Sequence, residues 1–180
     1  VLLPELTPPL KKLFMSFYMP LSKVYTEAEI LGVKIDVPYI KTIADENDER
    51  ILELEKTIFE IAEEEFNINS TQQLSHVLFD KLNYPILNKT LSGKPSTAEG
   101  ALKELTKKLR KKSPILTCVM EYRRLKKMNS TYLRPMVEKV DGNSRIHPSF
   151  LLHGTVTGRI SSKGPNIQNI PRDPRIKGMF

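Results

Sequence analysis

The segment TGRISSKGPNIQN, residues 157–169, carries an unusual density of hydrogen-bond donors. It holds one arginine, one lysine, three hydroxyls, three side-chain amides and two glycines, and it contains no carboxylate, histidine or cysteine. These side chains suit the binding and orientation of a partner, because none of them is a usual general base or metal ligand. The alternative is a turn cluster in which Ser, Asn and Gly satisfy one another.

An arginine followed by a loop rich in amides suits a surface that presents donors to nucleic acid. Every base pair offers acceptors at equivalent places in the minor groove, so a guanidinium held there senses pairing geometry without reading sequence. On this reasoning Arg159 contacts the minor groove. The nearby amides of Asn166, Gln168 and Asn169 donate to phosphate or sugar oxygens.

Patterns for covalent or metal chemistry are missing from the sequence. The three histidines, His76, His147 and His153, lie far apart and belong to no signature of a nucleophile with its base. The single cysteine, Cys118, excludes a disulfide framework and, with scattered histidines, gives no metal-ligand spacing. We therefore predict no catalytic residue and no metal site in this chain.

The loop SGKPST, residues 92–97, resembles a nucleotide phosphate loop only in part. The upstream glycine is missing, and Pro95 interrupts the order of lysine and serine. What remains is Lys94 followed by a serine at a predicted helix start, where Ser96 and Thr97 suit one backbone phosphate. The alternative is that Ser96 only caps its helix.

The positive charge is segregated along the chain. Residues 1–95 carry 10 basic and 15 acidic side chains, whereas residues 96–180 carry 18 basic and 6 acidic ones. A basic second half favours a polyanionic partner, because neutralised phosphates release counterions, although a solvated basic face has the same composition. No apolar run is long enough to cross a bilayer, so we expect no membrane partner and a reducing, intracellular location.

Periodicity predicts a mainly α-helical fold with a small antiparallel β portion. Helices are expected over residues 10–31 with a kink at Pro20, over 37–66 with Asp36 as cap, over 71–79, from the Ser96–Glu99 capping box onward, and from Ser113 onward. RIHPSF and GTVTGRI alternate like two short strands after the turn VDGNS.

Two of these helices carry informative faces. The apolar stripe of the first helix, from Leu10 to Leu31, is predicted to be core. The helix after Ser113 has one apolar side and another side that carries polar and basic residues. This second side consists of Arg123, Lys126, Lys127, Asn129 and Ser130.

TGRISSKGPNIQNIP resembles the T-G-R-[LI]-S-S-x-x-P-N-[LI]-Q-N-I-P signature of the family A DNA polymerases, the bacterial DNA polymerase I family. Further segments resemble that family in order and approximate spacing: LGVKID, FNINSTQQLSHVLFDKL, KTLSGKPST, EYRRLKKMNSTY, GNSRIHPSF and IKGMF. The short forms around HGTVTGRISS resemble phage-type members.

The resemblance implies the helical polymerase thumb plus part of the palm. It assigns residues 1–36 to a palm-base helix with the tail of an upstream exonuclease-like domain, residues 37–140 to the thumb, and residues 141–180 to strands and a loop leading into the palm. It also implies a partner, primer-template duplex DNA, and a second one, the remainder of the polymerase in the same or a separate chain.

The resemblance also implies roles for individual residues. Arg159 matches the arginine that enters the minor groove at the primer end, and the three amides match contacts to the primer-template. The thumb contacts are Arg123, Lys127, Ser130 and Thr131, and those of the thumb tip are Lys94, Ser96 and Thr97. Asn129 stands where the family often has a lysine, and Lys163-Gly164 where a Ser-Asp pair is usual.

The family's first catalytic motif follows shortly after the position of Phe180. We therefore expect this chain alone to be inactive, although it belongs to a nucleotidyltransferase, and we expect Mg²⁺ only in the complete polymerase. The expected location is the cytoplasm or nucleoid, or an organelle. One alternative is a free-standing, non-catalytic DNA-binding module or regulatory subunit, and another is a basic RNA-binding or scaffold protein.

Overall fold

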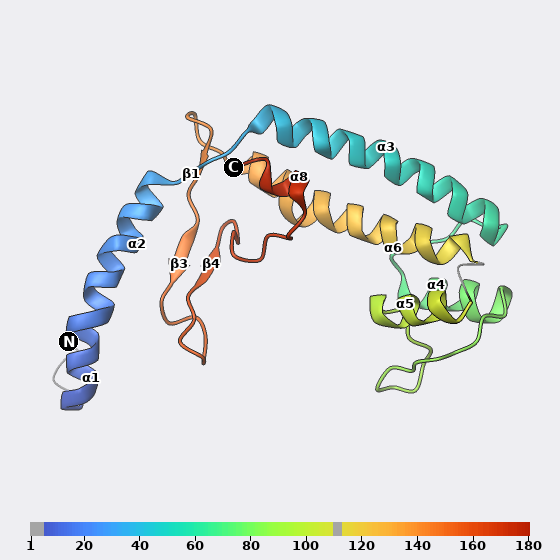
Figure 1. The fold of residues 1–180 in the computed structure, drawn as a ribbon, viewed down its shortest axis with the longest axis horizontal. Helices are drawn as coiled ribbons and strands as arrows, with labels where there is room; N and C mark the ends of the chain where they lie inside the picture. Colours follow the sequence, from blue (N-terminus) through green and yellow to red (C-terminus); the bar gives the residue numbers. More distant parts are fainter. Residues whose placement is uncertain (1–5, 110–112) are drawn as a thin grey trace. The chain divides into compact units, whose positions relative to one another are not determined.

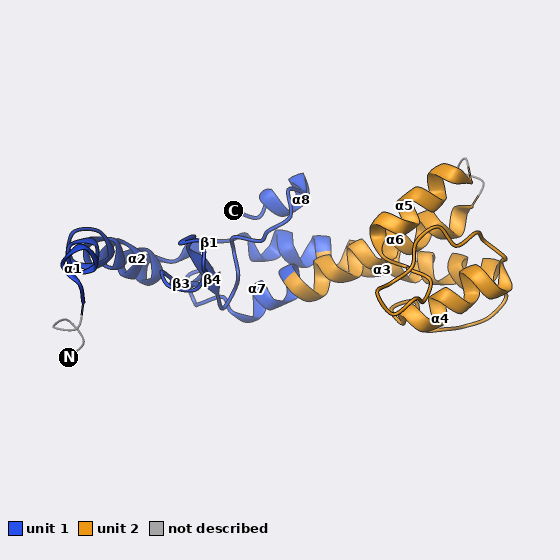
Figure 2. Ribbon diagram, turned by 90° about the horizontal axis from the view of Figure 1, so that it is seen from below, with its two compact units in different colours: residues 1–43, 132–180 blue, residues 44–131 orange. Residues whose placement is uncertain are grey.

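The computed structural model describes residues 6–109 and 113–180. It divides into two compact units, of which one contains the described residues up to Ile43 together with Tyr132–Phe180 and the other contains Ala44–Thr131 (Figure 2). The three-part division expected from the sequence stays a prediction. In the described ranges no helix is both long and apolar enough to cross a membrane.

The first unit begins with a nearly continuous helix (Figure 1). It consists of α1 (Pro8–Leu13), the π-helical stretch η2 (Phe14–Tyr18) and α2 (Met19–Leu31). The helix ends as predicted at Gly32, whose φ is 67°. A Cβ at that position would lie 2.7 Å from His147 Cε1 and 2.8 Å from the Ile146 carbonyl oxygen. Glycine is needed there for the backbone angle and for the close approach.

Two small antiparallel sheets complete the first unit. β1 (Val33–Lys34) pairs with β2 (Arg145–Ile146), which places Val33 opposite Ile146. β3 (Ser149–Leu151) pairs with β4 (Ser161–Lys163) and places Phe150 opposite Ser162. The short helices α7 (Arg134–Glu138) and α8 (Pro174–Lys177) belong to the same unit.

The second unit is a helical bundle. Its longest helix is α3 (Val37–Ala62), which starts in the first unit with the predicted cap, since Asp36 Oδ1 accepts from the Tyr39 amide at 2.9 Å. The others are α4 (Thr71–Ser75), π-helical η3 (His76–Lys81), α5 (Glu99–Lys108), α6 (Pro114–Lys127) and π-helical η4 (Met128–Leu133), whose last two residues lie in the first unit. The prediction of a mainly helical fold with a small antiparallel portion is confirmed.

The core of the second unit lies between α3 and α6, which run side by side (Figure 1), with the shorter helices packed against them. This core consists of apolar side chains and the ring of Tyr122, and the polar residues Asn47, Thr97, Ser113 and Asn129 are also buried in the second unit. Its members include Ile51, Leu54 and Ile58 of α3, Leu74 of α4 and Leu78 of η3, Leu102 and Leu105 of α5, and Ile115, Leu116, Val119 and Leu125 of α6.

Several sequence predictions about these elements are wrong. The apolar stripe of the first helix is not core, because no residue of α1, η2 or α2 is buried and Leu31 is 65% exposed. The second helix ends at Ala62 instead of residue 66, since Glu63 takes a left-handed backbone angle. The Ser96–Glu99 capping box does not form. Ala98 is the cap of α5, and Ser96 Oγ accepts from the Ala98 amide instead.

The predicted strand GTVTGRI is a loop with Gly158 at φ 72°, and strand β4 starts only at Ser161. β2 pairs with β1, more than one hundred residues earlier in the chain, and an isolated antiparallel bridge joins Val140 to Ile146 across the turn VDGNS. Long-range pairing of this kind leaves no local sequence signal.

Candidate nucleic-acid interface

The donor-rich segment surrounds β4 in the first unit. Arg159 lies in the loop that joins β3 to β4, and Asn166, Gln168 and Asn169 lie in the loop that follows β4. All four side chains are exposed. The structure therefore presents these predicted site residues on the surface, from two loops that flank one short strand.

Part of the segment forms a turn cluster whose polar groups hydrogen-bond one another, as the alternative interpretation expected. Thr155 Oγ1 donates to the Arg159 carbonyl oxygen at 2.6 Å. Asn166 Oδ1 accepts from Ser162 Oγ and from the Gln168 amide, each at 3.2 Å. These bonds use two hydroxyls, one main-chain amide, one carbonyl and one amide oxygen to fix the loop backbone.

The strongest donors of the segment remain outside this cluster. Within the described ranges no hydrogen bond or ion pair engages the guanidinium of Arg159 or the side-chain amides of Gln168 and Asn169. The Asn166 oxygen accepts two bonds, which orients its NH₂ group as a donor. The Arg159 guanidinium and these NH₂ groups are therefore available to a partner.

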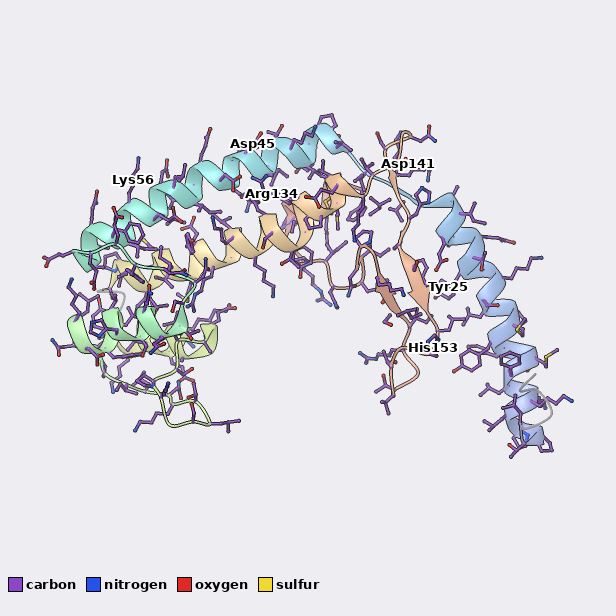
Figure 3. All side chains as sticks on the ribbon, turned by 180° about the vertical axis from the view of Figure 1, so that it is seen from behind. Tyr25, Asp45, Lys56, Arg134, Asp141 and His153 are labelled. Carbon is purple, nitrogen blue, oxygen red and sulfur yellow. The ribbon has the colours of Figure 1, made fainter. Side chains whose placement is uncertain are left out.

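A set of contacts with α2 positions the β3–β4 hairpin. The Phe150 amide donates to Glu29 Oε1, and the Phe150 ring packs on Tyr25 with 4.8 Å between centroids. Tyr25 points from α2 toward the hairpin (Figure 3). The Arg145 guanidinium donates to the carbonyls of Leu31 and Gly32 at 3.1 and 3.0 Å, which satisfies the last turn of α2.

His147 completes this attachment. Its Nδ1 lies 2.8 Å from the Glu29 carbonyl oxygen, and its Nε2 lies 3.1 Å from Asp141 Oδ2. Because both partners are acceptors, the doubly protonated ring makes both bonds. The Glu29 carbonyl and then the Asp141 carboxylate raise the pKa of His147. The Arg145 amide and then the His147 ring lower the pKa of Asp141.

The predicted thumb-tip residues surround a cleft of about 770 Å³ in the second unit. Lys94 is exposed, Ser96 is partly exposed, and Thr97 is buried, with only 4% of its surface exposed. The cleft is lined mainly by hydroxyl, amide and basic side chains, including Thr90, Ser92 and Arg123. The lining also includes the carboxylate of Asp80, and the contact of Lys94 and Ser96 with a phosphate stays a prediction.

The guanidinium of Arg123 is hydrogen-bonded to the main chain of two loops. Its Nη1 donates to the Thr97 carbonyl oxygen at 2.7 Å and its Nη2 to the Ile68 carbonyl oxygen at 3.4 Å. Burial lowers the pKa of this guanidinium from its ordinary value. Arg123 thus links the loop before α4 to the loop before α5, and its contact with a phosphate stays a prediction.

Three further predicted residues form an exposed row at the end of α6, which we call the α6 row: Lys127, Ser130 and Thr131. Asn129, predicted on the same face, is only 3% exposed. The prediction is wrong because Asn129 follows Leu125 by four residues and Tyr122 by seven, so it lies with the buried side of the helix.

Sequence reasoning missed two contributors. Asn47 is 2% exposed and bonds Asn129, and its signal is a polar residue within the apolar stripe of α3 between Ile43 and Ile51. Glu29 holds the hairpin, and no local pattern distinguishes it from other exposed glutamates. In the described part of the chain, no three His, Cys, Asp or Glu side chains are placed to hold a metal ion together.

Comparison with known proteins identifies the family of this chain. The model of DNA polymerase family A matches residues 37–180. The chain belongs to DNA polymerase family A. The resemblance seen in the sequence is thereby confirmed for most of its length.

Relatives within DNA polymerase family A include the thermostable DNA polymerase I of Thermus filiformis, 40% identical over 185 residues that cover 99% of this chain and 22% of the relative. The DNA polymerase I of Lactococcus lactis subsp. cremoris is 38% identical, and the match covers 85% of this chain and 17% of that polymerase. The chain thus spans about a fifth of the length of these relatives.

A solved family A structure also resembles this chain. The POL domain of Pol1 from M. smegmatis, in complex with DNA primer-template and dNTP, matches with a TM-score of 0.85 and 28% identity. The match covers 94% of this chain and 29% of the other. Residues 1–180 therefore correspond to part of a polymerase domain.

Proposed function

We propose that residues 1–180 grip primer-template duplex DNA behind the active site of a family A polymerase. Arg159 would enter the minor groove, and Asn166, Gln168 and Asn169 would donate to the primer-template backbone. The phosphate contacts of the second unit would come from Lys94, Ser96 and the α6 row. Arg123 and Thr97 would hold the loop that carries Lys94 and Ser96.

The observation that carries this proposal is the exposure of donors without protein partners in the two loops around β4. Within the described residues, Arg159, Gln168 and Asn169 have no protein partner for their side chains, so the donors of these groups are available to a bound molecule. A surface of this kind matches phosphate, sugar and minor-groove oxygens, which are all acceptors.

The proposal assigns no chemistry of bond making to these residues. In the complete polymerase, Mg²⁺ held by carboxylates outside the described residues would stabilise charge during nucleotidyl transfer. This chain's contribution is binding and orientation, which lower the barrier by holding the primer end in place.

Fluorescence anisotropy with a labelled duplex tests the grip. If about five phosphates are neutralised, the plot of log K against log salt concentration should have a slope of roughly −4 to −5. Lys127→Ala should make the slope shallower by about 0.9, because one phosphate contact is lost. A slope near zero for the unaltered chain would refute the proposal.

Lys56→Ala is the matched control. Lys56 is an exposed lysine on the acidic helix α3 (Figure 3), and its removal changes the net charge by the same amount as Lys127→Ala. The slope should stay unchanged in this variant. Equal effects of the two substitutions would mean that net charge alone drives binding, which contradicts a defined interface.

A further inference from the structure

Two buried amides face each other between α3 and the end of α6. Asn47 Nδ2 donates to Asn129 Oδ1 at 2.8 Å, and Asn129 Nδ2 donates to the Ala44 carbonyl oxygen at 2.9 Å and to Asp48 Oδ1 at 2.8 Å. The second hydrogen of the Asn47 amide faces Met128 Sδ at 3.4 Å. All of these residues belong to the second unit.

The amide pair interrupts an otherwise apolar interface. Along the same faces, α3 buries Ile51 and Leu54, and α6 buries Val119 and Leu125. Apolar contacts have little directionality, so several alignments along the helix axes bury similar areas. A buried amide is different, because leaving its donors or acceptor unpaired is costly, and only one alignment satisfies both side chains.

The pair is also placed where alignment matters for the surface. Asn129 is flanked in the sequence by Lys127 and Ser130, two residues of the exposed α6 row. It lies in η4, the π-helical stretch that continues α6. Anchoring Asn129 to α3 therefore fixes the direction in which the neighbouring row faces.

We propose that Asn47 and Asn129 are positioning residues that select one register of α3 against α6 and thereby orient the α6 row toward DNA. A single buried polar pair that specifies register at some cost in stability is known from coiled coils. The part that concerns DNA rests on the function proposed above. The part that concerns register does not depend on it.

A second link between the same helices serves as the comparison. Arg50 of α3 bonds Glu121 of α6 through Nε at 3.0 Å and Nη2 at 3.3 Å. Both side chains are solvent-exposed, at 49% and 36% of their surface. An exposed ion pair is screened and easily replaced by water, so it specifies register weakly.

Distances between spin labels on the full chain test the register. Leu52 of α3 is 58% exposed and Thr117 of α6 is exposed, so a cysteine at each position can carry a label. Cys118 is replaced by Ala so that it does not react with the label. The unaltered interface should give one narrow distance distribution. In Asn47→Leu/Asn129→Leu, we expect broadening or a shift of roughly one helical turn, about 5.4 Å. An unchanged narrow distribution would overturn the proposal, and so would the same change in the control Arg50→Gln.

Duplex affinity supplies the second arm. Asn47→Ala and Asn129→Ala should each weaken binding several-fold, and the double variant should lose no more than either single one, because the two amides act as one unit. Additive losses, or no loss, would overturn the proposal even if the leucine variant fails to fold. If the unaltered chain binds no duplex, the proposed function fails, and the label distances still decide the register.

Discussion

The guanidinium of Arg123 donates to the main-chain carbonyl of Thr97, with 2.7 Å between Nη1 and the oxygen. A second bond to the Ile68 carbonyl joins the loop before α4 to the loop before α5. Sequence reasoning placed Arg123 at the DNA surface, and the structure gives its donors to the protein. Arg123 therefore fixes the main chain of the cleft-lining loop that carries Lys94.

Replacing Arg123 by Ala should lower the free energy of unfolding by about 2 kcal/mol, because two loop carbonyls lose a charged donor. Duplex affinity should fall as the loop loosens, whereas the slope of log K against log salt should stay unchanged. Chemical denaturation and anisotropy titrations measure the two effects. A slope shallower by about 0.9 would show instead that Arg123 neutralises a phosphate itself.

Arg159→Ala should reduce discrimination against mispaired primer ends in a complete polymerase that contains this segment. A guanidinium in the minor groove bonds equivalent acceptors only when the pair has correct geometry. We expect the ratio of matched to mismatched extension to fall about tenfold, which corresponds to about 1.4 kcal/mol. Arg159→Lys keeps the charge and should recover the affinity more fully than the discrimination. An unchanged ratio would contradict the assigned role.

Primer extension by residues 1–180 alone should be undetectable with magnesium and all four nucleotides. The residues assigned here bind and orient DNA, and none of them is a carboxylate that could place metal ions for nucleotidyl transfer. Gel analysis of a labelled primer measures this, with a complete family A polymerase as the positive control. Robust extension would refute the division of labour proposed here.

The link from His147 to Glu29 and Asp141 should make stability depend on pH. The folded-state pKa of His147 is raised, so its contribution is present below the unfolded value near 6.5 and is lost as pH rises through the folded value. The pKa of Asp141 is lowered, so its contribution is lost only as pH falls through a value below 3.8. The attachment should be strongest in the mildly acidic window between them.

Thermal unfolding from pH 5 to pH 8 measures this dependence. The midpoint difference between the unaltered chain and His147→Gln should shrink as pH rises, because the neutral ring donates only one of the two bonds. Arg145 faces the same site and keeps its charge throughout, so it does not create the trend. A difference that stays constant across this range would argue against protonation of His147 as its source.

Features that depend on residues close together in the sequence were predicted correctly. The cap at Asp36, the end of α2 at Gly32 and the predominance of helix all follow from residue types and periodicity, and they are confirmed. The donor-rich segment was also recognised from composition, because its amides, hydroxyls and arginine are consecutive in the chain.

Other features depend on contacts that are distant in the sequence. Two examples are the pairing of β1 with β2 and the bond from Arg123 to Thr97. Both form only in the tertiary fold, so no local sequence pattern predicts them. Asn129 was assigned to the polar side of α6, although it follows Leu125 by four residues and lies with the buried side. The stripe from Leu10 to Leu31 has the periodicity of a core face, yet periodicity does not say what packs against it.

The packing of α3 against α6 gives the second unit an electrical polarity. α3 carries seven acidic and three basic residues, and α6 carries one acidic and four basic ones. Since their apolar sides face each other, their charged sides face outward in different directions. A nearby polyanion would be repelled from one helix and attracted to the other, so the unit would experience a torque before any contact forms. The same arrangement that builds the core would therefore pre-align the encounter, and its benefit would appear in the association rate at low ionic strength.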